Sequence, residues 1–162
     1  MRKDLIKLEK KPGEYFDCTP LHGKWCTFNM EGKDVGFARV GIISSGEGYV
    51  LIQYRDKRGL VSKRYITSID EINMTSRMLR KEKELIVEDW DDSVNPFSLF
   101  LDERCDIHLH QTRLFEASPG FFAARIDFVG ENIIRIKENS KTFNVKQGMI
   151  CALMETRYGS KT

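Results

Sequence analysis

Short apolar runs separated by charged turns dominate the first half of the chain. Residues 25–30 alternate between apolar and polar side chains, as a half-buried strand does. Two longer apolar runs, 48–54 and 60–66, flank a charged turn at 56–59, which is the pattern of a β-hairpin. A further run at 35–44 precedes them. Together these runs predict a strongly bent, mainly antiparallel sheet of the small-barrel kind.

The same pattern returns in the second half of the chain. An offset of 83 residues places Ile43 on Ile126 and Lys63 on Lys146, with no gap between the two pairs. Strands are expected in the second half at 106–112, 121–128, 131–137, 142–146 and 149–154. Because solenoid repeats are usually ~20–50 residues long, two units of about half the chain each indicate a duplicated domain.

Breaker residues and charged stretches set the expected domain boundaries. We expect a first barrel with an amino-terminal extension over residues 1–74 and a second barrel with its own amino-terminal helix over 93–162. Between them, residues 75–92 form a helical or charged linker. Apolar residues recur among charged ones in this linker at spacings that predict an amphipathic helix around 75–83.

The segment that precedes the first strand is not patterned as a strand or a long helix. Pro20 interrupts residues 14–23, so we expect a loop with at most one helical turn. Its aromatic and aliphatic side chains are expected to hold this loop in place, namely Tyr15, Phe16 and Leu21.

The segment that precedes the second barrel begins with a helix-start signal. Ser93 or Asn95 can cap the free amides, and Pro96 suits the first helical position. Helical spacing then predicts a short helix with one aromatic face, formed by Phe97, Phe100, Leu101 and Arg104.

Composition excludes several classes of protein. The 162 residues are 41% hydrophobic and 31% charged, which is ordinary for a globular chain. No apolar run approaches the ~18 residues of a membrane span, and residues 1–11 lack the apolar core of a signal peptide. We therefore expect a cytoplasmic protein without a membrane partner. Its four cysteines are scattered without a CxxC pair, which is typical of reduced thiols in a core: Cys18, Cys26, Cys105 and Cys151.

The charges are segregated along the chain, although the formal net charge is only +2. Basic residues cluster at 55–64 and again at 77–83, whereas acidic residues gather at 88–92. Segregation of this kind can give a nearly neutral protein one positive face. Solvated turns and helix faces explain the same pattern equally well, so charge alone does not assign a ligand.

The sequence carries no signature of an enzyme or of a cofactor site. It has no P-loop, nucleophile elbow or zinc-protease motif, so we expect neither catalysis nor a cofactor. His108 and His110 fall on one face of an expected strand, with Cys105 nearby. A closed zinc site needs a fourth ligand, so ordinary strand histidines are the simpler interpretation.

Several stretches resemble the Sm-like family of RNA-binding proteins, and within it most of all the bacterial Hfq chaperones. In the first half, VGIISSGEGYVLIQY and VSKRYITSI are similar to the core of that family. In the second half, NPFSLFLDER is similar to its amino-terminal helix, and ARIDFVGENIIRIK and NVKQGMI are similar to its strands. The resemblance implies two tandem Sm-like or SH3-like antiparallel barrels of about five strands each, with short helices in the connections.

The resemblance also implies a non-catalytic protein that binds single-stranded RNA through a basic, aromatic rim. Sm-like proteins form rings by pairing edge strands, so three two-barrel chains would make a pseudo-hexameric ring. Tyr49 matches the aromatic that stacks on a base, and Lys63 and Arg64 match the basic pair that contacts phosphate and base edges. In the second unit, Lys146 and Gln147 match that pair.

The charged hairpin adds Arg55 and Arg58 to the expected RNA-binding residues. We expect Lys63 and Arg64 to be exposed strand charges, whose replacement leaves the fold intact. Tyr49 also fits a core aromatic, because its neighbours are apolar.

An alternative hypothesis requires no nucleic acid. It is a tandem SH3-like module for protein–protein interaction, with a peptide groove lined by Trp25, Tyr49, Tyr54 and Tyr65. The two hypotheses differ in their response to salt. Binding through phosphates weakens steeply as salt rises, whereas docking on aromatic side chains hardly changes.

Overall fold

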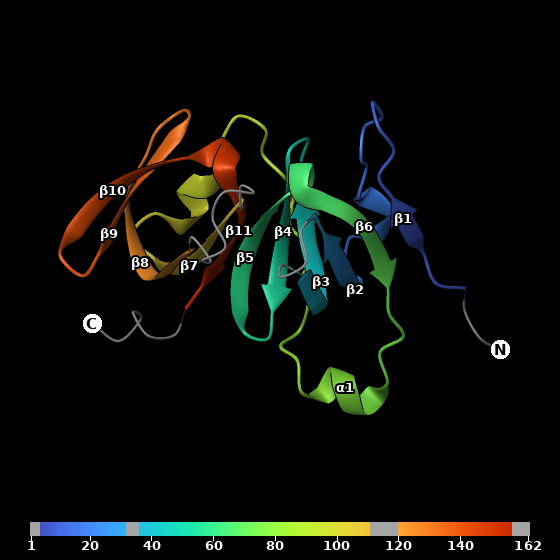
Figure 1. Cartoon of the computed structure of the whole chain (residues 1–162). Helices are drawn as coiled ribbons and strands as arrows, with labels where there is room; N and C mark the ends of the chain where they lie inside the picture. Colours follow the sequence, from blue (N-terminus) through green and yellow to red (C-terminus); the bar gives the residue numbers. More distant parts are fainter. Residues whose placement is uncertain (1–3, 32–35, 111–119, 157–162) are drawn as a thin grey trace. The chain divides into compact units, whose positions relative to one another are not determined.

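Antiparallel strands make up most of the chain in the computed structural model, which describes residues 4–31, 36–110 and 120–156 (Figure 1). The chain divides into two compact units, unit 1 (Met1–Trp90) and unit 2 (Asp91–Thr162). The prediction of a mainly β, antiparallel protein with few helices is confirmed. Within the described residues, no helix is long and apolar enough to cross a membrane.

Unit 1 contains one open antiparallel sheet with the strand order β1-β6-β2-β3-β4-β5. Its elements are β1 (Lys7–Glu9), η1 (Thr19–Leu21), β2 (Trp25–Met30), β3 (Gly36–Ser45), β4 (Tyr49–Tyr54), β5 (Lys57–Ser62), η2 (Lys63–Tyr65), β6 (Ile66–Glu71) and α1 (Ser76–Arg80). The end strands β1 and β5 do not pair with each other, so strand pairing does not close this sheet into a barrel.

Unit 2 repeats this plan with the strand order β11-β7-β8-β9-β10. Its elements are η3 (Pro96–Phe100), β7 (Arg104–Leu109), β8 (Gly120–Val129), β9 (Ile133–Glu138), β10 (Lys141–Lys146), η4 (Gln147–Met149) and β11 (Ile150–Glu155). Again the end strands β11 and β10 do not pair with each other. β7 begins two residues before the strand predicted at 106–112 and ends at Leu109. Residues 111 and 112 of that prediction lie outside the described part of the chain.

The elements from β2 to β6 match those from β7 to β11 in order and in length. β3 and β8 have 10 residues each, and they begin at Gly36 and Gly120, which are 84 residues apart. The same spacing separates Lys63 from Gln147, which begin η2 and η4. The offset of 83 is therefore wrong by one residue, and Lys63 corresponds to Gln147. The run 50–52 is apolar at every position, so a slip of one residue still places apolar on apolar.

The run 60–66, predicted as one strand, is divided by η2. β5 ends at Ser62 and β6 begins at Ile66, which places the two strands at different positions in the sheet. A continuous strand cannot pair with β4 at one end and with β2 at the other, so the chain has to turn between them. The charged hairpin turn also lies earlier than predicted: Tyr54 pairs with Lys57, and Arg55 takes the positive φ of 58° that this two-residue turn requires.

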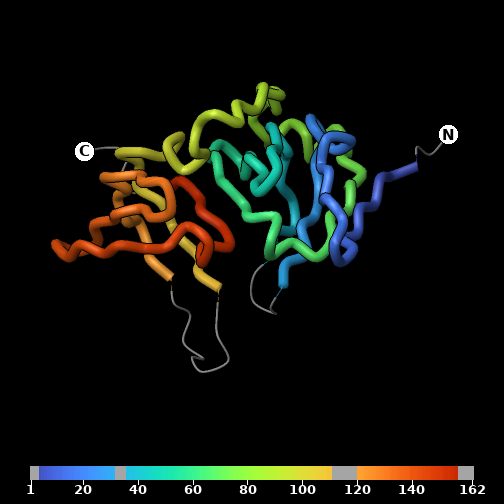
Figure 2. The backbone as a smooth tube through the Cα atoms, turned by 90° about the horizontal axis from the view of Figure 1, so that it is seen from above, coloured from blue at the N-terminus to red at the C-terminus, as the bar shows by residue number. Residues whose placement is uncertain are grey.

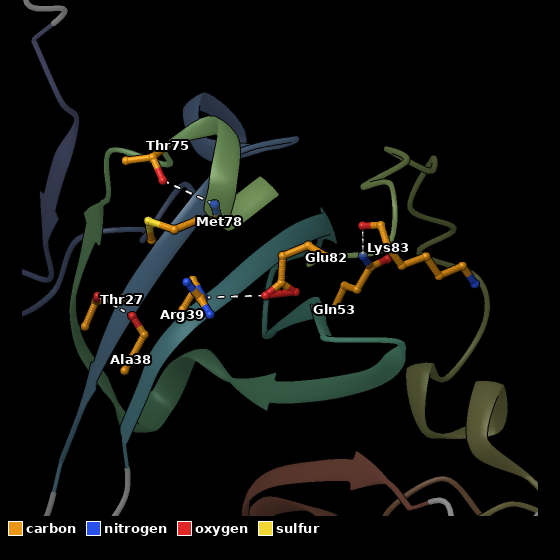
Figure 3. Close-up of polar contacts among 8 residues, drawn as sticks. All are labelled: Thr27, Ala38, Arg39, Gln53, Thr75, Met78, Glu82 and Lys83. Atoms are coloured by element: carbon orange, nitrogen blue, oxygen red, sulfur yellow. Dashed lines mark hydrogen bonds and ion pairs between the residues drawn. The ribbon is translucent and has the colours of Figure 1, made fainter. Parts of the chain in front are cut away.

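Both predicted helices are present, although each is shorter than expected. Thr75 caps α1 by accepting a hydrogen bond from the Met78 amide at 3.2 Å (Figure 3). Asn95 caps η3 in the same way, accepting from the Phe97 amide at 3.0 Å. Because η3 is a 3₁₀ helix with three residues per turn, Phe97 and Phe100 share the buried face, while Leu101 lies outside it.

Residues 82–90, here called the strap, follow α1 and pack on the sheet of unit 1. Arg39 Nε lies 3.5 Å from Glu82 Oε1, and Gln53 Nε2 donates to the Lys83 carbonyl at 2.7 Å (Figure 3). The Glu88 amide donates to the Ile43 carbonyl at 3.1 Å. The second half of the segment predicted as a linker therefore has a defined place against the first sheet.

Two glycines of unit 1 make room for the strap. A Cβ on Gly41 would lie 2.7 Å from Leu85 Cδ1, and a Cβ on Gly46 would collide with the Trp90 indole. At both positions the absence of a side chain lets a large apolar group approach the backbone closely.

The loop before β2 is held by two buried side chains and one surface contact. Phe16 and Leu21 are buried as predicted, whereas Tyr15 is 62% exposed and contacts the Lys63 ammonium. All four cysteines are free and buried, as predicted for reduced core thiols. Burial raises the pKa of the Cys18 thiol to about 11.

Candidate nucleic-acid interface

Lys63 begins the turn η2, at the junction between β5 and β6. Its amide donates to the Gly48 carbonyl at 2.9 Å, which ties the turn to the start of β4. Although lysine is usually exposed, this residue is only 4% exposed. The prediction of an exposed strand charge is therefore wrong for Lys63, because η2 replaces the strand and places this side chain in the interior. Arg64, the next residue, is exposed as expected.

An exposed aromatic ring lies against the buried Lys63 ammonium. Lys63 Nζ is 4.7 Å from the centroid of the Tyr15 ring and 3.5 Å from Tyr15 Oη. This distance is within the range of a cation–π contact, which strengthens as the cation loses water. The geometry therefore joins a partly desolvated positive charge to an aromatic face that solvent can reach.

Nearby charges oppose the effect of burial on Lys63. Burial lowers the pKa of the Lys63 ammonium, while the Cys18 thiol and the carboxylates of Asp17 and Glu47 raise it. Asp17 is itself held ionised, since hydrogen bonds from the Thr19 hydroxyl and amide lower the pKa of its carboxyl. The site thus contains a cation and compensating acidic groups, rather than a uniformly positive patch.

Two further tyrosines lie in or beside η2. Tyr49, the first residue of β4, pairs with Ser62 and is half-buried, and burial raises the pKa of its hydroxyl. Tyr65 is buried, and the Arg64 guanidinium carbon lies 5.6 Å from the centroid of its ring. Of these two rings, only that of Tyr49 retains substantial contact with solvent.

Further polar groups come from segments distant in sequence. Lys10 Nζ donates to the carbonyls of Lys63 and Arg64, at 3.1 and 2.8 Å, and so covers the carbonyls of η2. His22 Nε2 lies 2.6 Å from Ser45 Oγ. Burial lowers the pKa of the His22 imidazole, against an opposing effect of the Asp17 charge.

These groups form what we call the Lys63 cluster, which consists of Lys10, Tyr15, Asp17, His22, Tyr49, Lys63 and Arg64. Sequence reasoning found Tyr49, Lys63 and Arg64 but missed the other four. The available signal was the Asp17–Thr19 pattern of a side-chain-capped turn, which marks a built loop without showing what the loop contacts.

The hairpin arginines are not part of this cluster. Arg55 and Arg58 lie at the β4–β5 turn, and the six residues of β4 separate that turn from Tyr49 by ~17 Å at ~3.4 Å per residue. The Arg55 guanidinium lies 5.4 Å from the Tyr54 ring, and Arg58 Nη2 is 3.7 Å from Glu88 Oε1 of the strap. The predicted RNA-binding residues of unit 1 therefore fall into two separate groups.

The equivalent position in unit 2 holds a neutral amide. Gln147 is 7% exposed, and its backbone amide donates to the Asn132 carbonyl at 2.9 Å, just as that of Lys63 donates to Gly48. Gln147 Nε2 donates to the carbonyls of Gly130 and Ile133, at 2.8 and 3.0 Å. These contacts use both donors of the amide.

Asn95 extends this set of hydrogen bonds, and its side chain and that of Gln147 together are here called the amide clasp. Asn95 Nδ2 donates to Gln147 Oε1 at 3.0 Å and to the Gly130 carbonyl at 3.1 Å. Lys146, which precedes Gln147, is exposed at the end of β10 opposite Ile133. The pair matched by resemblance in unit 2 therefore consists of one exposed lysine and one buried amide whose hydrogen bonds join protein groups.

Among the described residues, no group of three or more His, Cys, Asp or Glu side chains is arranged to hold a metal ion. Cys105 is buried, and burial lowers the pKa of His108. For the peptide-groove alternative, Trp25 and Tyr65 are both buried, so neither can line an exposed groove.

The Lys63 cluster combines a buried cation, two aromatic faces that solvent reaches and an exposed guanidinium. Stacking on aromatic faces and pairing with cations are the two interactions by which proteins hold unpaired nucleotides. Comparisons of the chain with family models, with curated proteins and with solved structures found no match.

Proposed function

We propose that the chain binds single-stranded RNA, without catalysis, at the Lys63 cluster of unit 1. The supporting observation is the Lys63 ammonium, which is buried and lies 4.7 Å from the ring of an exposed tyrosine. A base that stacks on Tyr15 gains ~1–3 kcal/mol. The same base would lie close to a cation that water screens poorly, so a base carbonyl or phosphate oxygen would interact with it more strongly than at the surface.

Other residues of the cluster extend this surface. Tyr49 offers a second, half-buried aromatic, and Arg64 presents a guanidinium that can contact a phosphate with two parallel hydrogen bonds. Unpaired bases suit this arrangement better than a duplex does, because stacking requires base faces that a duplex hides. Asp17 and Glu47 disfavour a long run of phosphates over Lys63 itself.

The strand order supports the proposal of two tandem Sm-like or SH3-like barrels. In each unit the last strand returns to pair with the first strand of the five-strand repeat, β6 with β2 and β11 with β7. This return brings the ends of the repeat together, as the curvature of a small barrel requires.

The test uses a matched pair of lysine variants. Lys63→Gln places in unit 1 the residue that unit 2 carries, whereas Lys146→Gln removes an exposed lysine beside the equivalent turn. Fluorescence anisotropy with labelled uridine-rich and adenine-rich oligonucleotides is expected to show binding at low salt that weakens as salt rises. We expect Lys63→Gln to weaken this binding by about tenfold, ~1.4 kcal/mol, because the variant removes a positive charge that water screens poorly beside the bound base. Lys146→Gln should bind as the parent chain does.

Three results would contradict the proposal. The first is no binding of either oligonucleotide at low salt, and the second is an equal loss in the two variants. The third is binding that salt leaves unchanged, which would favour the protein-interaction module instead. Circular dichroism and thermal melting of Lys63→Gln establish that a lost affinity does not come from a lost fold.

A further inference from the structure

β1 covers the outer edge of β6. The two strands pair in the register Lys7 with Asp70, Leu8 with Ile69 and Glu9 with Ser68, and they lie side by side in Figures 1 and 2. Backbone hydrogen bonds extend the pairing at both ends, from the Lys10 amide to the Thr67 carbonyl at 3.0 Å and from the Glu71 amide to the Ile6 carbonyl at 2.8 Å. No counterpart of β1 occurs among the described residues of unit 2.

The cover is slight compared with the strand that it covers. β1 has three residues, of which two are exposed and Leu8 is half-buried, whereas β6 has six. Without β1, the outer edge of β6 would present unpaired backbone groups at Thr67, Ile69 and Glu71. An exposed strand edge of this length is a ready template for pairing with another chain.

We propose that β1 is a guard strand, and that β10 of a second copy of the chain adds to β6 when β1 leaves. β10 lies at the end of the strand order of unit 2 and has six residues, the same length as β6. Several strands have six residues, so length alone does not identify the strand that is added.

Charge complementarity selects β10. β6 ends in Asp70 and Glu71, and β1 places Lys7 opposite Asp70. β10 carries Lys141 and Lys146 at its two ends and no acid between them. An antiparallel pairing that brings the free backbone groups of the two strands together, with Asn144 opposite Thr67, places Lys141 opposite Asp70, the position that Lys7 of β1 occupies in the folded chain.

The consequence concerns assembly, which can be measured without RNA. A ring joined through strand edges would use the edge of β6, and β1 occupies that edge. In the folded chain, β1 therefore prevents another strand from pairing with β6. Displacement of β1 makes the edge of β6 available.

Two proline variants at adjacent positions test the guard. The bonds of Ile6 and Lys10 place the backbone of every second residue toward β6, so the Leu8 amide faces β6 and the Glu9 amide faces away. Leu8→Pro removes a ladder donor, whereas Glu9→Pro is tolerated on an edge whose amide faces solvent. Light scattering without RNA should give Leu8→Pro a mass that rises above 18.8 kDa as concentration increases, because a β10-to-β6 contact leaves one free edge at each end of the assembly. Glu9→Pro should stay at the mass of the parent chain.

A third variant tests the occupant. β9 and β10 are joined by a two-residue turn, and Glu138 pairs with Lys141, so the Asn144 amide faces away from β9. Asn144→Pro in the Leu8→Pro background should therefore restore the monomer mass. A raised mass that persists in this variant would show that β10 is not the added strand.

A folded Leu8→Pro chain that keeps the mass of the parent would overturn the guard itself. If circular dichroism shows that Leu8→Pro is unfolded, Leu8→Gly provides the test, because it keeps the amide and only weakens the packing of β1. A folded Leu8→Gly chain whose mass does not rise even at high concentration would equally overturn the proposal. Because these measurements contain no RNA, their failure leaves the proposed RNA site untouched.

Discussion

Lys63 and Gln147 occupy the same place in two units that repeat the same elements, yet one is a buried cation and the other a buried amide. In both units the residue begins a 3₁₀ turn and its backbone amide closes the turn onto the preceding hairpin. The side chain of Gln147 is used within unit 2, in bonds to two carbonyls and to Asn95. The Lys63 ammonium instead lies against Tyr15, which solvent reaches. One backbone position thus serves stability in unit 2 and offers a binding surface in unit 1.

The residues around η4 are also less aromatic and less cationic than those around η2. The counterpart of Tyr49 is Ile133, and the counterpart of Arg64 is Gly148. Both aromatic and cationic character are therefore lost from the turn of unit 2. Among the described residues, the additional segments β1 and the strap also belong to unit 1 alone. The two units share one backbone plan, and the ligand-binding chemistry that we propose belongs to unit 1 alone.

The largest effect is expected from removing the amide clasp of unit 2. Gln147→Leu removes one donor each from the half-buried carbonyls of Gly130 and Ile133 and the acceptor of Asn95 Nδ2, which should lower the free energy of unfolding by ~2–3 kcal/mol. Urea unfolding followed by circular dichroism measures this change. Lys146→Ala, at the exposed neighbouring residue, should change it by less than ~0.5 kcal/mol. Equal effects of the two substitutions would remove the distinction between a structural and a binding turn.

A smaller loss of stability is expected from a substitution at the contact between the strap and the sheet of unit 1. Gly46→Ala places a Cβ into the Trp90 indole and should cost about 2 kcal/mol, because a packed contact must open to admit it. Gly48→Ala, two residues further along, meets nothing within 4 Å and serves as the control. Trp90 fluorescence and thermal melting report the two effects. A Gly46→Ala chain as stable as the control would show that the strap is not held at this contact.

The smallest effect is expected from exchanging the aromatic at the edge of the cluster. Tyr49→Ile introduces the residue that unit 2 carries and should weaken RNA binding by ~1 kcal/mol, about fivefold, because a half-buried ring contributes less stacking than an exposed one. Tyr54→Ile, at the far end of the same strand, should leave affinity unchanged. The measurement is anisotropy titration at fixed salt. A larger loss at Tyr54 would move the binding surface to the hairpin that carries Arg55 and Arg58.

Much of the strand pattern was predictable because strands are recognised by local alternation. β2 spans Trp25–Met30, as its alternation predicts, and β3 and β4 each begin or end within one residue of the predicted run. The turn at η2 was not predictable, because residues 60–66 have the composition of one continuous strand. What breaks that strand is the need for β6 to pair with β2, a partner about 40 residues earlier in the chain. Local pattern contains no information about that pairing.

The candidate site was predictable only in part for the same reason. Tyr49, Lys63 and Arg64 were found through their resemblance to a known motif, whereas Tyr15 lies 48 residues before Lys63 and was interpreted as a loop anchor. A one-residue slip in the internal alignment also paired Lys63 with Lys146 and hid the contrast with Gln147. Apolar runs tolerate such a slip, but the backbone hydrogen bonds of the two turns do not.

The amino-acid sequence by itself determined where most of the strands lie, where the first helical turns begin and that the chain is built as a repeat, because each of these depends largely on neighbours a few residues apart. Only the tertiary structure decided that Lys63 is buried beneath Tyr15, that Gln147 is bonded to Asn95 and that β1 covers β6. Burial and the partners of a polar group depend on what folding brings close. For these three contacts, the residues that meet are about 50 or more positions apart in the chain.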